Sequence, residues 1–113
     1  MRPEVLKLLF DVAEACDLLE RFTEGRTFED YQADAMLHSA VERQLEIVGE
    51  ALNVALRLDP SLTKQVSDAP RIVAFRNRLA HGYAAVSDAV VWGVLEGSLP
   101  TVHREVRGLL ETD

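Results

Sequence analysis

Apolar residues recur at intervals of three and four along most of the chain, which is the spacing of one face of an α-helix. The clearest run extends from about Ala33 to Leu58, where one stripe is formed by Leu37, Val41, Leu45, Val48, Leu52 and Ala55. Charged and amide residues fill most of the remaining arc. Gln44 lies on the apolar side, so it is expected to have a hydrogen-bond partner or to mark an interface.

The same periodicity predicts a helix before this one. Pro3 suits a first helical turn, where its missing N–H would have no partner. The apolar positions continue to Leu19, and Gly25 ends the segment. Thr27 is a candidate N-cap for the next helical segment, with Glu29 and Asp30 favourable in its first turn.

The second half of the chain carries three further helical segments. Asp59 and Pro60 end the long helix, and residues 61–70 are expected to form a loop or a short helix. The next helices are expected to begin at Pro70, after Ser87, and near Val102, with a break at 97–100. No sustained alternation and no Asn-Gly or Asp-Gly turn indicates a strand. The sequence predicts an all-α fold, an antiparallel bundle of four to five helices.

Composition narrows the class of protein. A chain of 113 residues corresponds to one domain, spanning 1–113, and 48% apolar with 27% charged residues is typical of a globular protein. No apolar run approaches the roughly 18 residues that span a bilayer, so no membrane association is expected. The start of the chain does not resemble a signal peptide, and Cys16 has no second cysteine to pair with. A cytoplasmic location and a small core side chain at Cys16 are expected.

The charge distribution is uneven. The net charge of −7 argues against a protein that coats nucleic acid non-specifically. Yet the stretch between Asp68 and Asp88 contains no acidic residue, and it contains three arginines: Arg71, Arg76 and Arg78. A locally positive field of this kind suits a small phosphate-handling site, although a solvated helix face would look the same.

One ridge of the long helix carries a histidine and three glutamates spaced by four: His38, Glu42, Glu46 and Glu50. A carboxylate-bridged metal bundle would also need Glu-x-x-His pairs on facing helices, and the sequence has none. We interpret the ridge as a solvated or interface face with Arg43 and Arg57 as ion-pair partners. No metal and no cofactor is predicted.

The remaining candidates are Arg76, Asn77, His81 and Tyr83. Arginine binds phosphate through a planar fork and keeps its charge, and histidine exchanges a proton near neutrality. Together they meet the needs of RNA cleavage by the adjacent 2′-hydroxyl, without a metal. Five residues span about 140° around an ideal helix, so Arg76 and His81 do not share a face unless the helix loosens near Gly82. Alternatively, His81 simply caps a helix end.

These residues carry a resemblance to a known family. "FRNRLAHGY" resembles the Arg-x4-His-x-Tyr signature of the HepT-like branch of HEPN proteins, with Arg76, His81 and Tyr83 at its defining positions. "AVERQLEIVGEALN" is similar to the family's long helix with its Ile-Gly-Glu-Ala ending, although Val48 replaces the usual isoleucine and Gln44 a frequent asparagine. "VVWGVLEGSLPTVHREV" resembles the family's C-terminal helices. The likeness covers the chain from about Asp30 onward.

The resemblance implies an endoribonuclease toxin of a bacterial or archaeal toxin–antitoxin pair that cuts tRNA or mRNA. Arg76 and His81 would be catalytic, with Asn77 supporting them. The toxin would be a homodimer with both motifs in a cleft at the interface, and the apolar excess on the long helix also favours a dimer. The partner would be a nucleotidyltransferase antitoxin of the MNT type, which in some pairs transfers AMP to the tyrosine, here Tyr83.

Two other interpretations remain open. HEPN-type bundles also occur as non-catalytic binding modules that present a substrate or nucleotide to a nucleotidyltransferase, and the chain could be a purely structural dimerising bundle. The intact Arg76 and His81 pair favours the nuclease, since a binding module could dispense with His81. A nucleotidyltransferase gene next door would support the nuclease or the binding module over the structural bundle.

Overall fold

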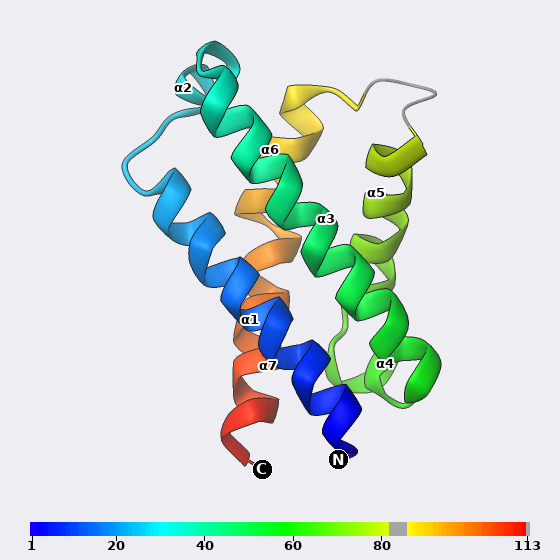
Figure 1. Ribbon diagram of the computed structural model, residues 1–113. Helices are drawn as coiled ribbons and strands as arrows, with labels where there is room; N and C mark the ends of the chain where they lie inside the picture. The colour runs from blue at the N-terminus through cyan, green and yellow to red at the C-terminus, as the bar shows by residue number, and fades with distance from the viewer. Residues whose placement is uncertain (82–85, 113) are drawn as a thin grey trace.

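The computed structural model describes residues 1–81 and 86–112, which form seven helices (Figure 1). Five are long: α1 (Pro3–Thr23), α3 (Ala35–Leu58), α5 (Ala69–His81), α6 (Asp88–Glu96) and α7 (Ser98–Thr112). Two are short: α2 (Phe28–Ala33) and α4 (Leu62–Gln65). The described residues contain no strand. The all-α prediction is confirmed, while the assignment of 1–113 to a single domain stays a prediction.

Local chemistry explains where the first helices begin. Thr27 Oγ1 accepts a hydrogen bond from Asp30 N at 3.1 Å, and Thr27 N donates to Asp30 Oδ2 at 2.9 Å. This reciprocal capping box starts α2. Asp34 then interrupts the helical path, and its Oδ1 accepts from the backbone of Met36 and Leu37. The long helix predicted from about Ala33 therefore begins at Ala35.

The end of the bundle follows the predicted breaks, with one refinement. Ser87 caps α6, since its hydroxyl accepts from Val90 N at 3.3 Å. Gly97 separates α6 from α7. Pro100 lies inside the first turn of α7, not in a loop before it, because proline fits a turn whose N–H groups have no intrahelical acceptor.

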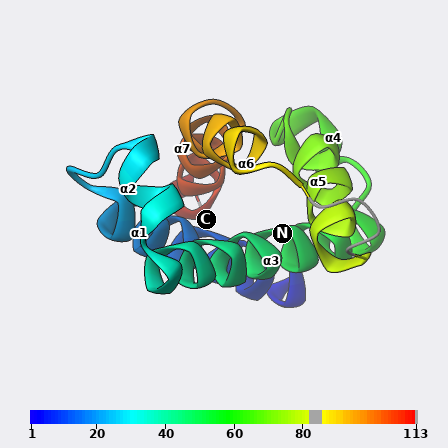
Figure 2. The ribbon, with the colours of Figure 1, turned by 90° about the horizontal axis from the view of Figure 1, so that it is seen from above.

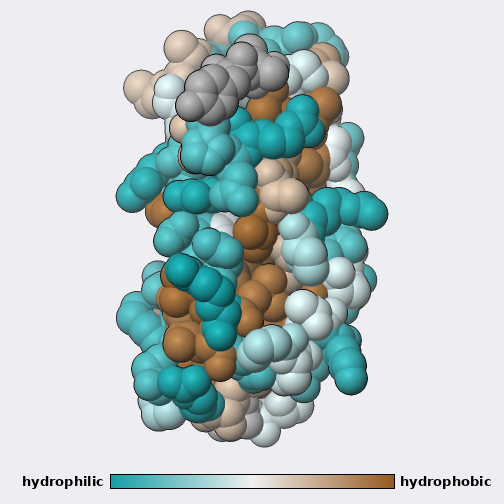
Figure 3. Space-filling view, turned by 90° about the vertical axis from the view of Figure 1, so that its right-hand side faces the viewer, coloured by the Kyte–Doolittle hydropathy of each residue, from teal (hydrophilic) through white to brown (hydrophobic). Residues whose placement is uncertain are grey.

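The helices form two layers. α1 and α3 pack against each other in front, and α7 covers α1 while α5 covers α3 from behind (Figures 1 and 2). The core between them is almost entirely aliphatic, and its fully covered side chains include Val5, Leu9, Leu19, Val41, Leu45, Leu52, Leu62 and Ile72. Each such side chain contributes about 1.5–3 kcal/mol through burial. On the side that carries α4 and α5, a strip of hydrophobic side chains remains visible between hydrophilic ones (Figure 3).

An aromatic cluster ties α6 to the start of α3. Tyr31 is fully buried and stacks on His38 at 4.7 Å between ring centroids, beside Trp92. His38 Nε2 lies 2.7 Å from Asp88 Oδ1 in the first turn of α6. Burial raises the pKa of the Tyr31 hydroxyl, which has no hydrogen-bond partner among the described residues.

No helix in the described ranges is both long and apolar enough to cross a bilayer.

Candidate active site

The residues singled out from the sequence lie at the end of α5. Arg76 faces α3 and is half-buried, whereas Asn77 is exposed and His81 is the exposed last residue of the helix. α5 is continuous from Ala69 to His81. The two candidate catalytic residues are therefore about 140° apart around the axis and roughly 7.5 Å apart along it. Tyr83 and Gly82 fall outside the described residues.

A glycine on the long helix allows Arg76 to sit where it does. A Cβ built at Gly49 would overlap Cβ and Cγ of Arg76. Gly49 is buried inside α3, so the absent side chain is what lets α5 cross α3 closely at this point. Both residues belong to segments that carry the family resemblance, and the fold brings those segments into contact.

The guanidinium of Arg76 is held from two sides. Nη2 lies 3.1 Å from Glu50 Oε2, and Nη1 donates to Asn77 Oδ1 at 3.2 Å. Nε is buried and has no hydrogen-bond partner within the part of the chain that the structure describes. Arginine has five N–H donors, and Nη1 donates one of them to Asn77, so both terminal nitrogens keep N–H groups for a ligand.

Arg76 also borders a groove of about 520 Å³ on the outer side of α1 and α3. Its apolar lining comes from Leu8, Ala15, Leu18, Ile47, Ala51 and Val54. Gln44, predicted to have a partner or mark an interface, is half-buried and lines this groove with Arg43 and Glu46. Ile47, Ala51 and Val54, which are apolar residues of α3 outside the stripe named above, thus line the groove that Arg76 borders.

The acidic ridge of α3 is a set of ion pairs. Glu46 pairs with Arg43 at 3.9 Å, and His38 Nδ1 lies 3.6 Å from Glu42. Glu50 pairs with Arg76 and not with Arg57, a partner that sequence spacing did not reveal. The acid-free stretch around Arg76 therefore receives a carboxylate from another helix, which lowers its local positive charge. In the sequence, Gly49 beside Glu50 is the feature that could have indicated a close helix crossing at this point.

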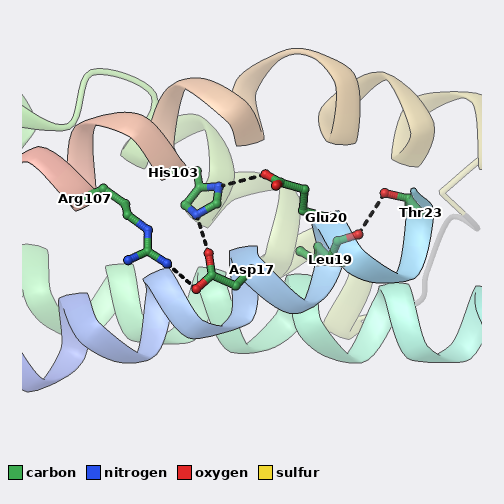
Figure 4. A network of polar contacts seen from close by, with 6 residues as sticks. All are labelled: Asp17, Leu19, Glu20, Thr23, His103 and Arg107. Atoms are coloured by element: carbon green, nitrogen blue, oxygen red, sulfur yellow. Dashed lines mark hydrogen bonds and ion pairs between the residues drawn. The ribbon is translucent and has the colours of Figure 1, made fainter. Parts of the chain in front are cut away.

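A larger cavity of about 610 Å³ lies between α1 and α7, away from these residues. His103 Nε2 lies 2.8 Å from Asp17 Oδ1, Nδ1 lies 3.6 Å from Glu20, and Arg107 donates to Asp17 (Figure 4). The hydrogen bond from Arg107, with that from His103, lowers the pKa of the Asp17 carboxyl. These contacts join α7 to α1, and we assign them a structural role.

The described residues contain no cluster of three or more histidine, cysteine or acidic side chains suited to a metal ion. Arg76 supplies a fixed cation, which can bind a phosphodiester, and His81 supplies an imidazole, which can transfer a proton. The described copy does not bring these two side chains together.

Comparison with known proteins points to the same chemistry. A family model described as "Ribonuclease HepT-like" matches residues 12–109. A protein of Thermococcus cleftensis named "Probable ribonuclease HepT" is 35% identical over 98 residues, covering 83% of this chain and 84% of that protein. A protein of Caldanaerobacter subterraneus, named as a candidate RNase, is 28% identical over 104 residues, covering 90% of each.

A third relative, also named as a candidate RNase, comes from Methanocaldococcus jannaschii. It is 26% identical over 105 residues, which cover 91% of this chain and 94% of that protein. No solved structure matches the chain.

Proposed function

The chain belongs to the HepT-like ribonuclease family, and from this premise we propose that it is the toxin of a toxin–antitoxin pair, an endoribonuclease that cuts tRNA or mRNA. The observation that carries the proposal is the placement of Arg76. Its guanidinium is held at the edge of a groove, and the exposed imidazole of His81 follows five residues later in the same helix. Ribonuclease activity is the activity by which the family is described.

The proposed reaction is attack by a ribose 2′-hydroxyl on the adjacent phosphorus. The 2′-oxygen forms a bond to phosphorus, and the bond from phosphorus to the 5′-oxygen breaks. The neutral imidazole of a His81 accepts the 2′-hydroxyl proton, and an imidazolium returns a proton to the leaving 5′-oxygen. Arg76 stabilises the charge on the phosphorane oxygens, and Asn77 supports Arg76 through its Oδ1. The reaction needs no metal.

A homodimer would complete this site. Because Arg76 and His81 lie about 140° apart on one helix, a single copy does not aim both at one phosphate. A two-fold axis near α5 would let Arg76 of one copy act with His81 of the other. The groove formed by α1 and α3, with Gln44 in its lining, is the surface we assign to the second copy.

Neutralisation is proposed to come from an MNT-type nucleotidyltransferase antitoxin encoded beside this chain. Transfer of AMP to Tyr83 would place a phosphate and a nucleoside next to His81. The added negative charge would occupy the arginine fork that otherwise holds the substrate phosphate.

The test of the proposed nuclease is substitution of each catalytic residue. Arg76→Ala and His81→Ala are expected to lower RNA cleavage and toxicity by about 10²–10⁴-fold, with circular dichroism and melting unchanged. Arg78→Ala is the matched control, because it removes the same charge from an exposed position of the same helix. It should retain cleavage. Activity should also persist in EDTA.

Cleavage of RNA by the His81→Ala protein at the wild-type rate would refute the catalytic assignment. Loss of wild-type activity in EDTA would refute the metal-free mechanism. If the wild type cuts no RNA but binds the antitoxin, the chain is instead a non-catalytic binding module for the nucleotidyltransferase.

A further inference from the structure

We propose that Glu50 is a positioning residue for Arg76, an inference that rests on the proposed ribonuclease function. Glu50 lies on α3, one residue after the glycine over which Arg76 crosses, and its Oε2 is 3.1 Å from Arg76 Nη2. It is separated from the motif by more than twenty residues in sequence. Its role is to fix the direction in which the guanidinium offers its remaining donors.

The stem of Arg76 is fixed first. Its Cβ and Cγ lie against the backbone of α3 at Gly49, and its Nε is buried. The side of the guanidinium that includes Nε is therefore closed to a ligand. Only the two terminal nitrogens can approach an RNA phosphate, so their orientation decides how well the fork fits the transition state.

The two terminal nitrogens are then held separately. Glu50 forms an ion pair with Nη2 at 3.1 Å, and Asn77 Oδ1 accepts one N–H of Nη1. These contacts oppose rotation of the guanidinium plane about its last bonds. Without Glu50, the guanidinium plane of Arg76 would be held only by Asn77, which is itself exposed.

The charge of Glu50 separates positioning from substrate attraction. Its side chain is half exposed, so the ion pair contributes little to the free energy of unfolding. The carboxylate also repels an RNA phosphate, so removing it should not weaken RNA binding. A residue that orients Arg76 should therefore change the rate of the chemical step, while RNA affinity stays equal or improves.

The experiment compares Glu50→Ala, Glu50→Gln and Glu42→Ala as full-length chains. Glu42 lies two turns earlier on the same ridge of α3, does not line the groove, and faces His38 Nδ1 at 3.6 Å instead of Arg76. Cleavage of total tRNA and mRNA gives kcat and KM for each. RNA affinity is measured in a His81→Ala background, so that the RNA stays intact.

We expect Glu50→Ala to lower kcat by about 10–100-fold, as a misplaced catalytic group does. Glu50→Gln keeps an oxygen acceptor for Nη2 and should recover most of the rate. Glu42→Ala should cut RNA at the wild-type rate. RNA affinity in the His81→Ala background should be at least as high with Glu50→Ala as without it, and melting temperatures should match.

A wild-type or faster kcat in Glu50→Ala would overturn the inference. An equal loss in Glu50→Ala and Glu42→Ala would also overturn it, because it would indicate a general charge effect. If Glu50→Ala fails to fold, the Glu50→Gln rate and its melting temperature decide instead: a folded protein without activity would also overturn the inference. The proposed function fails separately, if Arg76→Ala still cleaves RNA. Inactive Arg76→Ala with unaffected Glu50→Ala would leave the nuclease intact and remove only the role of Glu50.

Discussion

Cys16 shows how burial alone can settle the role of a reactive residue type. Its side chain is almost fully covered in the core, and burial raises the pKa of the thiol to about 12. The thiolate, which is the nucleophile, is therefore essentially absent at neutral pH. The interpretation of Cys16 as a small core side chain is confirmed.

At the same scale, Tyr83 is the residue on which the proposed neutralisation depends. We predict that co-expression with the cognate nucleotidyltransferase and ATP adds one or more AMP units to Tyr83 and silences cleavage, because the adduct occupies the arginine fork and blocks the cleft. Intact mass and peptide mapping would detect the modification directly. Tyr83→Phe should stay folded and escape it.

The Tyr83→Phe protein also separates modification from simple binding. If the antitoxin silences this variant as completely as the wild type, with no added mass, then inhibition acts through complex formation. The role assigned to Tyr83 would then be wrong.

Individual residues also mark the limit of inference from sequence. Arg76 could be identified because an arginine, a histidine and a tyrosine at short spacing form a local pattern. Its contact with Glu50 could not, because that contact depends on which helices pack together and on their rotation about their axes. Spacing along α3 indicates only that Arg43 and Arg57 lie beside the acidic ridge, since sequence periodicity describes only contacts within a helix.

At the scale of helices, the close crossing of α3 and α5 determines where Arg76 lies. Gly49→Ala should lower the free energy of unfolding by roughly 1–3 kcal/mol, as overpacking usually does, and should reduce cleavage. Alanine is the better helix former by about 1 kcal/mol, but the new methyl group meets the stem of Arg76 close to its backbone. Chemical denaturation and cleavage rates would measure both effects.

Gly93→Ala is the matched control for this prediction. Gly93 also lies within a helix, α6, but a Cβ built there meets nothing within 4 Å. It should be neutral or stabilising. A stabilised and fully active Gly49→Ala protein would show that α5 can shift without cost, and that the close crossing does not hold Arg76.

Helix boundaries were the most predictable part of the fold, because caps are local. Ser87 and Pro3 act as their residue types suggest. The start of α3 at Ala35 was missed by two residues, since Asp34 is compatible with a helix and becomes a cap only because it bonds the following backbone. The layering of α5 and α7 behind α1 and α3 had no local signal.

For the whole molecule, the main prediction is a homodimer at micromolar concentration, with an interface of obligate size. Ile47→Asp should produce a monomer and abolish cleavage, because it places a charge in the groove between α1 and α3 and separates Arg76 from the partner copy. Sedimentation would measure the mass. Val90→Asp, at a hydrophobic residue already 41% exposed on α6, is the control and should remain dimeric.

A wild-type protein that sediments only as a monomer of the 12.6 kDa chain would contradict the dimer. A dimer that Ile47→Asp leaves intact and Val90→Asp breaks would place the interface over α6 instead. In that case the cleft would have to be rebuilt around a different face.

The dependence of Arg76 on a glycine in a distant helix has a consequence for reading genomes. A cell that makes the proposed toxin without its antitoxin is under selection to lose the activity, and a bulkier residue at position 49 can remove it while the motif stays unchanged. Such copies would accumulate as intact genes that encode inactive proteins. A survey that identifies active toxins only by Arg76, Asn77 and His81 would therefore count inactive relatives as active. The residue at position 49 should be examined together with these three.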